Sequence, residues 1–164
     1  MYPNVEPQTP SRTCFFNVPK INVVDAKINP RLLEADTLSD VLEIRESADV
    51  QQRILRLAFT PEVKESANFW EALDSQVQYI GANPERKEDR HSADRVQDKI
   101  DDARNRSSEI LDPDMTNPVG LIKEGILNIL NVSEFTDKQA NVAIAYYLQE
   151  LLSDRKAAVN AKSA

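Results

Sequence analysis

The chain has 164 residues and a mass of 18.5 kDa, which is enough for one modest hydrophobic core and too little for two independent domains. Its 20 basic and 27 acidic residues give a net charge of −7. The resulting negative field repels phosphate backbones and argues against direct binding to nucleic acid.

Residues that could form a catalytic, metal-binding or phosphate-binding site are scarce. The three glycines, Gly81, Gly120 and Gly125, are too scattered to predict a P-loop or a dinucleotide fingerprint. One cysteine and one histidine cannot form a Cys/His zinc site or a disulfide framework, and His91 lies among charged residues, as a solvated surface histidine does. An EF-hand beginning at Asp112 fails, because Lys123 stands where the bidentate acid belongs. The sequence therefore predicts no enzyme, no metal and no cofactor.

Residues 1–29 predict an extended docking arm rather than a domain. Five of the nine prolines fall within the first thirty residues, where they block helix formation. The same segment is rich in aromatic and β-branched residues, which a disordered tail would not carry. The arm either packs back on its own helices or crosses to a neighbouring subunit, and the sequence leaves both open. The predicted contact residues are Phe15, Phe16, Val18, Ile21, Val23 and Val24.

From Pro30 onward the pattern is helical, and a domain over residues 30–155 is expected. Four pairs of a capping residue followed by a proline predict helix starts: Asn29-Pro30, Thr60-Pro61, Asn83-Pro84 and Asn117-Pro118. A helix over residues 61–80 carries one apolar stripe, with Phe69 and Trp70 as predicted core anchors.

Residues 84–111 predict a long charged helix whose opposite charges recur at helical spacing. Residues 85–91 could instead be a charged loop, with Ser92 capping a shorter helix. Complementary charges on this helix are expected to set the register against the next subunit. The predicted contact residues are Arg90, Asp94, Arg95, Asp98, Asp102 and Arg106.

The C-terminal third predicts two more helices. Residues 119–130 are apolar on nearly all sides, which favours a buried central helix over an exposed hydrophobic interface. Thr136 and Gln139 form a capping box for the last helix, and residues 156–164 are expected to be a frayed tail. The predicted fold class is therefore all-α: a small helical bundle with an extended proline-rich N-terminal arm and one long charged helix.

Together these features favour a non-enzymatic structural protein that works through protein–protein interaction and assembly. The hypothesis is a homo-oligomeric subunit of a large symmetric particle, such as a virion head, neck or tail accessory protein. Its partners would be copies of itself or other subunits, with no nucleic acid, no membrane span and no small-molecule substrate. The protein is expected to be made in the cytoplasm as a soluble chain and then incorporated into the particle. The alternative is a soluble helical adaptor or regulatory module that binds a client protein transiently.

Overall fold

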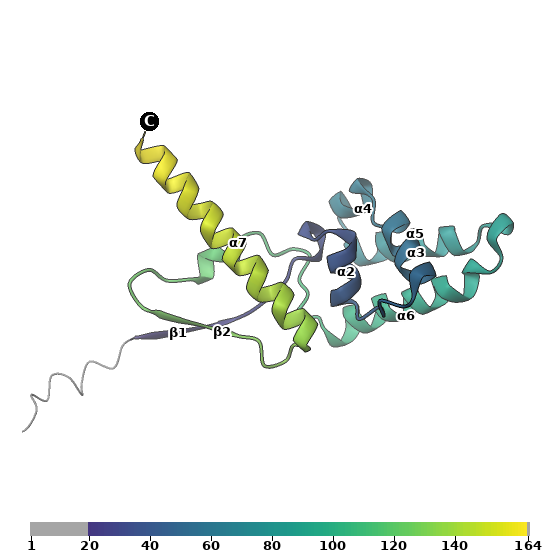
Figure 1. Cartoon of the computed structure of the whole chain (residues 1–164), viewed down its shortest axis with the longest axis horizontal. Helices are drawn as coiled ribbons and strands as arrows, with labels where there is room; N and C mark the ends of the chain where they lie inside the picture. The colour runs from purple at the N-terminus through teal and green to yellow at the C-terminus, as the bar shows by residue number, and fades with distance from the viewer. Residues whose placement is uncertain (1–19, 164) are drawn as a thin grey trace, which may run out of the picture.

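The computed structural model describes residues 20–163 (Figure 1). Helices α2 to α6 gather at one end of the molecule, while the two strands and α7 lie at the other (Figure 1). The elements in chain order are β1 (Ile21–Asp25), η1 (Pro30–Leu32), α2 (Ala35–Val41), α3 (Asp49–Ala58), α4 (Pro61–Glu65), α5 (Phe69–Gly81), η2 (Pro84–Arg86), α6 (Asp89–Arg106), η3 (Val119–Leu121), β2 (Leu127–Asn131) and α7 (Asp137–Lys162).

The two strands form a parallel sheet, so the prediction of an all-α fold is wrong. β1 pairs with β2 in register from Ile21 opposite Leu127 to Asp25 opposite Asn131. Parallel strands cannot be joined by a tight hairpin and require a long crossover, which here holds α2 to α6. Of the predicted arm, residues 1–19 lie outside the described residues, and residues 21–25 form a strand whose partner belongs to the same chain.

The predicted helix over residues 119–130 is absent for a local reason. Only the turn η3 forms at its start, and Gly125 adopts a φ of +77°, a left-handed conformation that ends any helix there. The following apolar run becomes β2 because β1 offers it a hydrogen-bonding partner. A short apolar run has no periodicity that separates a strand from a buried helix, which explains the error.

The helices α2 to α6 enclose the main core. Phe69 and Leu73 of α5 are buried against Val96 and Ile100 of α6, and α5 and α6 pack closely as an antiparallel hairpin. The single helix predicted over residues 61–80 is interrupted at residues 66–68, between α4 and α5. Phe69 is buried in the core as predicted, whereas Trp70 is half-buried and packs against the core, where it meets Phe69 edge to face.

The chain enters and leaves the helical unit, residues 30–106, at one narrow point that we call the neck. Here the Ile28 amide donates to the Ile110 carbonyl at 2.8 Å, and the Asp112 amide donates to the Ile28 carbonyl at 3.0 Å. Ile28 is fully buried, and its bridge to Leu111 runs parallel. The neck therefore adds an isolated parallel bridge, between the segment after β1 and the segment after α6, at the base of the helices.

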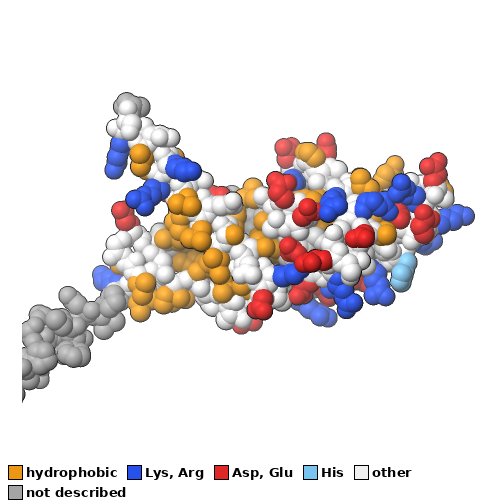
Figure 2. All heavy atoms as spheres, in the orientation of Figure 1, with side chains coloured by type: hydrophobic (Ala, Val, Ile, Leu, Met, Phe, Trp, Pro, Cys, Tyr) orange, Lys and Arg blue, Asp and Glu red, His pale blue; other side chains and the backbone are white. Residues whose placement is uncertain are grey.

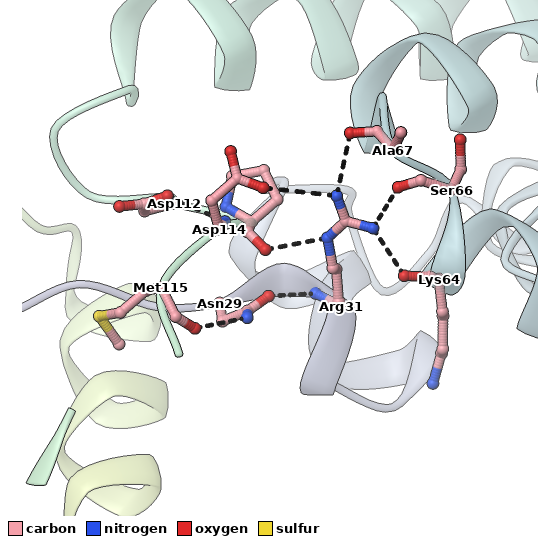
Figure 3. Close-up of polar contacts among 9 residues, drawn as sticks. Asn29, Arg31, Lys64, Ser66, Ala67, Asp112, Asp114 and Met115 are labelled. Atoms are coloured by element: carbon pink, nitrogen blue, oxygen red, sulfur yellow. Dashed lines mark hydrogen bonds and ion pairs between the residues drawn. The ribbon is translucent and has the colours of Figure 1, made fainter. Parts of the chain in front are cut away.

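A single arginine fastens the helical unit at the neck (Figure 3). The Arg31 guanidinium donates to the carbonyls of Pro113 and Lys64 at 2.9 and 2.8 Å, and also to that of Ser66. It lies over the Phe69 ring, 5.4 Å from the centroid. The planar fork of arginine, with its five N–H donors, thus joins η1, the α4–α5 connection and the loop after α6, which neither a shorter side chain nor the ammonium of lysine could do.

We expect Arg31→Met to lower the free energy of unfolding by about 2 to 3 kcal/mol, because it leaves several partly buried carbonyls without a donor. Arg31→Lys should lose most of the same amount, since an ammonium cannot reach three segments. Urea unfolding followed by circular dichroism measures both. The control is Arg56→Met, which breaks an exposed pair with Asp36 and should change stability by less than about 0.5 kcal/mol. Equal losses at positions 31 and 56 would contradict this role for Arg31.

We expect Gly81→Ala to destabilise the α5–α6 hairpin by about 1 to 3 kcal/mol, through overpacking. A Cβ at Gly81 would overlap the Cβ of Ala93 on the facing helix. Combining Gly81→Ala with Ala93→Gly should recover part of the loss, and thermal unfolding of the three variants measures this. If the Gly81→Ala protein unfolds at the wild-type temperature, the two helices are not in such close contact.

Candidate functional site

A polar cleft lies where the two parallel strands end. The carboxyl ends of parallel strands share one edge of a sheet, and open α/β sheets commonly bind ligands there. The cleft has a volume of about 500 Å³. Its polar lining comes from β1, from the segment after α6 and from the segment after β2, and consists of Asp25, Lys27, Ser108, Glu109, Asn131, Ser133 and Glu134.

The last residues of the two strands are joined side chain to side chain across the cleft. The Asn131 amide nitrogen donates to Asp25 Oδ1 at 2.9 Å, and the Asn131 side-chain oxygen accepts from the Ser133 amide at 3.2 Å. Asn131 thereby aligns the end of β1 with the turn that follows β2. This contact depends on the register of the sheet, because a slip of one residue would separate Asp25 from Asn131.

Lys27 is the only cation that lines the cleft among the described residues. Its ammonium lies 3.7 Å from Asp112 Oδ2, and its backbone amide donates to the Tyr147 hydroxyl at 3.2 Å. Asp25, Glu109 and Glu134 make the cleft acidic, so it repels a phosphate group. No group of three His, Cys, Asp or Glu residues within residues 20–163 is arranged to hold a metal ion. The cleft can orient a polar ligand by hydrogen bonds, and it has no evident nucleophile or acid–base pair.

Two tyrosines lie side by side on α7, and one of them accepts a hydrogen bond from the backbone of Lys27, a residue of the cleft. Tyr146 and Tyr147 meet edge to face with centroids 6.0 Å apart. Burial raises the pKa of Tyr147, and burial together with the charge of Glu150 raises the pKa of Tyr146. Only the Tyr147 hydroxyl has a hydrogen-bond partner among the described residues, because the Tyr146 hydroxyl is buried without one.

The predicted arm residues fall into three groups. Phe15, Phe16 and Val18 lie outside the described residues. Ile21 and Val23 are exposed on the outer face of β1, whereas Val24 is buried on its inner face. Their role as partner contacts stays a prediction.

The predicted contact residues of the charged helix all lie exposed along α6: Arg90, Asp94, Arg95, Asp98, Asp102 and Arg106. Within the described part of the chain, only Asp102 and Arg106 form an ion pair with each other, at 3.4 Å. Arg90 and Asp94 border a hollow of about 760 Å³ beside the α5–α6 turn, and none of the six lines the strand-end cleft. The helix begins at Asp89, after the turn η2, between the two starts that the sequence left open.

Sequence reasoning missed the cleft residues themselves. Asp25 follows the apolar run of β1, and Asn131 follows that of β2. A polar residue at the end of an apolar strand is the signal that could have found them, but it is visible only once residues 127–131 are recognised as a strand.

A parallel sheet with a crossover of helices and a cleft at its carboxyl edge places the protein in the α/β class. The family model described as "Helicase HerA, central domain" matches residues 10–151. The chain belongs to this family, which has a P-loop ATPase-like domain of helices and a parallel sheet.

Curated relatives agree with this assignment. The chain is 32% identical over 154 residues to the "DNA double-strand break repair helicase HerA" of Sulfolobus acidocaldarius and to the protein of that name from Sulfurisphaera tokodaii. Identity to the Saccharolobus solfataricus protein of the same name is 25% over 155 residues. Each match covers 85% of this chain and 30% of the relative, so the chain spans about a third of the length of these relatives.

These findings overturn the functional predictions from the sequence. The prediction of a non-enzymatic virion or adaptor protein is wrong, because the family is one of helicases and ATPases. The exclusion of nucleic acid as a partner is wrong for the same reason, since the relatives are named for DNA repair. The net charge misled because it averages over all 164 residues, whereas binding to a polyanion depends on the charge of a local surface. No helix among the described residues is long and apolar enough to cross a membrane.

We expect the two tyrosines to respond oppositely to removal of the hydroxyl. Tyr147→Phe should lower the free energy of unfolding by about 1 kcal/mol, because the Lys27 amide loses its acceptor. Tyr146→Phe should leave stability unchanged or raise it, since its buried hydroxyl has no partner among residues 20–163. Urea unfolding at neutral pH measures both, and equal losses would contradict these contacts.

Because the pKa values of these two tyrosines are raised, we expect the folded protein to lose stability in alkaline solution. Their pKa values in the folded protein lie above the ordinary 10.0, so their contribution to stability is complete below about pH 10. It falls as the pH rises further, because the unfolded chain releases the phenolic protons first. The double variant Tyr146→Phe, Tyr147→Phe should flatten this decline in urea unfolding between pH 9 and pH 12. A wild-type decline that the double variant reproduces in full would assign the effect to other groups.

Proposed function

We propose that these residues form part of the central domain of a HerA-type, ATP-driven helicase that acts on DNA in double-strand break repair. The observation that carries the proposal is the family match, which runs continuously through both strands, the neck and all the helices between them. The three relatives named for this activity support it. A role on DNA also favours the cytoplasm as the place of action, and nothing supports incorporation into a virion.

The residues present do not fit the phosphates of ATP. Gly120 and Gly125 have the spacing of the two P-loop glycines, but Ile126 and Leu127 follow where a P-loop has Lys and then Ser or Thr. These glycines also precede a strand, whereas a P-loop lies between a strand and a helix. The strand-end cleft is acidic, and its one cation faces Asp112. Phosphate binding would therefore fall to residues outside these 164.

In this proposal the chain supplies structural elements of the ATPase, namely two strands of its sheet and a helical unit, rather than the phosphate-binding residues. β1 and β2 supply two parallel strands, and Asp25 and Asn131 lie at the carboxyl edge, where α/β proteins place their ligands. The helical unit projects from the same edge through the neck. Because Ile28 and Arg31 fix the base of the unit, a force on the helices would be transmitted to the ends of the strands.

The proposal is tested by phosphate release from ATP, with and without double-stranded DNA. The isolated 164-residue chain should not hydrolyse ATP, because it has no P-loop. The natural gene product that contains these residues should hydrolyse ATP faster when DNA is present. Asn131→Ala in that gene product should lower the stimulated rate several-fold by releasing Asp25 and the turn after β2.

Asn160→Ala is the matched control, because Asn160 is exposed near the end of α7 and should leave the rate unchanged. ATP hydrolysis by the isolated chain, or a gene product whose ATP hydrolysis DNA does not affect, would contradict the proposal.

A further inference from the structure

The helical unit is held to the rest of the molecule at two main places. One is the neck, where both crossing segments are joined by backbone hydrogen bonds around the buried Ile28. The other is the contact of α2 with the start of α7 (Figure 1), in a region where Figure 2 shows charged side chains on the surface. We call the polar part of this second contact the clasp, and its residues are Asp40, Val41, Glu46, Lys138 and Gln139.

One glutamine caps both helices of the clasp. The Gln139 side-chain nitrogen donates to the Val41 carbonyl at 3.0 Å, in the last turn of α2, where helix carbonyls otherwise lack a partner. The Gln139 side-chain oxygen accepts from the Thr136 amide at 3.1 Å and so completes the capping box of α7. The end of α2 and the start of α7 are thus fixed to each other by one buried side chain.

The ion pairs of the clasp are exposed. The Lys138 ammonium lies 3.1 Å from Asp40 Oδ1 and 3.3 Å from Glu46 Oε1. These three side chains keep 49%, 45% and 84% of their surface exposed. Ion pairs between exposed groups are weak, and salt screens them further. Water and ions therefore compete with this part of the clasp, whereas the neck is held by backbone pairing.

The clasped position of α2 is locally strained. Glu43, directly after α2, has a φ of +57°, a left-handed conformation at a position where helix ends usually have glycine. The Ser39 hydroxyl of α2 is buried and has no hydrogen-bond partner among residues 20–163. A hollow of about 100 Å³ also remains beside the clasp, between the ends of α2 and α6 and Gln139. Weak ion pairs and one glutamine thus hold a position that has costs of its own.

The clasp connects the two walls of the strand-end cleft. One wall includes Lys27 and Ile110, which continue into the neck and the helical unit. The opposite wall includes Ser133 and Phe135, which lead directly into α7. While the clasp holds α2 on α7, the helical unit bridges the two walls and fixes the width of the cleft between them.

We propose that the clasp is a releasable strap that controls access to the strand-end cleft. When it opens, the helical unit pivots at the neck, and the wall that carries Lys27 moves away from the wall that carries Ser133. Glu43 then leaves its left-handed conformation, and the Ser39 hydroxyl gains water as a partner. The neck stays paired in both positions, so no new contact within the chain is needed. By linkage, a ligand that binds both walls favours the clasped position.

Nitroxide labels on either side of the clasp test the proposal in the full chain. They are attached at Asp98→Cys on α6 and Ser153→Cys on α7, both exposed, in a background with Cys14→Ser. Pulsed electron spin resonance then measures the distances between the labels and the population of each distance. Two populations are expected. Raising sodium chloride from about 0.05 to 1 M should increase the released population several-fold, because salt screens the Lys138 ion pairs.

Substitutions in and beside the clasp should move the populations in opposite directions. Lys138→Gln should increase the released population several-fold and remove most of its dependence on salt. Glu43→Gly, which relieves the left-handed conformation, should decrease it several-fold. The matched control is Arg56→Gln, which breaks an exposed ion pair with Asp36 of α2 away from α7 and should change neither population.

A second pair of labels tests the link to the cleft. Ser108→Cys and Ser133→Cys place the labels on the two walls, and their distance should lengthen whenever the released population rises. Walls that do not move with the helical unit would overturn the proposal. A single narrow distance across the clasp that neither salt nor Lys138→Gln alters would also overturn it, as would equal shifts in Lys138→Gln and Arg56→Gln.

The salt titration needs no substitution in the clasp, so it decides the question even if a clasp variant fails to fold, which circular dichroism reports. The readout involves neither ATP nor DNA. Its outcome is therefore independent of the proposed function.

Discussion

The parallel pairing of β1 with β2 is the constraint on which the rest of the structure depends. It joins residues 106 apart in sequence, such as Asp25 and Asn131, so every element between them must begin and end at one place. Ordering so long a loop is costly in entropy, which explains why the chain secures it again at the neck. There Ile28 forms an isolated parallel bridge with Leu111, and Arg31 joins three segments within reach of one guanidinium. The strand-end cleft is a direct product of the same pairing.

Local signals in the sequence predicted several of the helices and their caps. The Thr60 and Thr136 caps form as expected, the latter as a full capping box with Gln139, and Asn29 caps the turn η1. The charged helix is present, with Val96, Ile100 and Ala103 on its buried face. These features depend on residues within four positions of one another, which is the range that pattern reasoning covers.

The sheet and the cleft depend on residues that are much further apart in the sequence than four positions, so local patterns could not predict them. Residues 127–131 carry no information about their distant partner, and the choice between helix and strand is decided by β1. Asp25 and Asn131 become neighbours only through that choice. The functional prediction failed for another reason: these 164 residues contain no P-loop, so no local motif indicates a family of ATPases. The curated relatives are about three times longer than this chain, which matches about a third of their length.

The central claim is that β1 and β2 pair in parallel, in this register and within one chain. An engineered cysteine pair tests it most directly, in a background with Cys14→Ser. Paired residues on adjacent strands have Cα atoms about 5 Å apart, within reach of a disulfide. Val23→Cys with Ile129→Cys should therefore oxidise to a disulfide within the monomer, whereas Val23→Cys with Leu130→Cys, on opposite faces, should not. A disulfide that forms only between two chains, or forms equally in both pairs, would contradict the account.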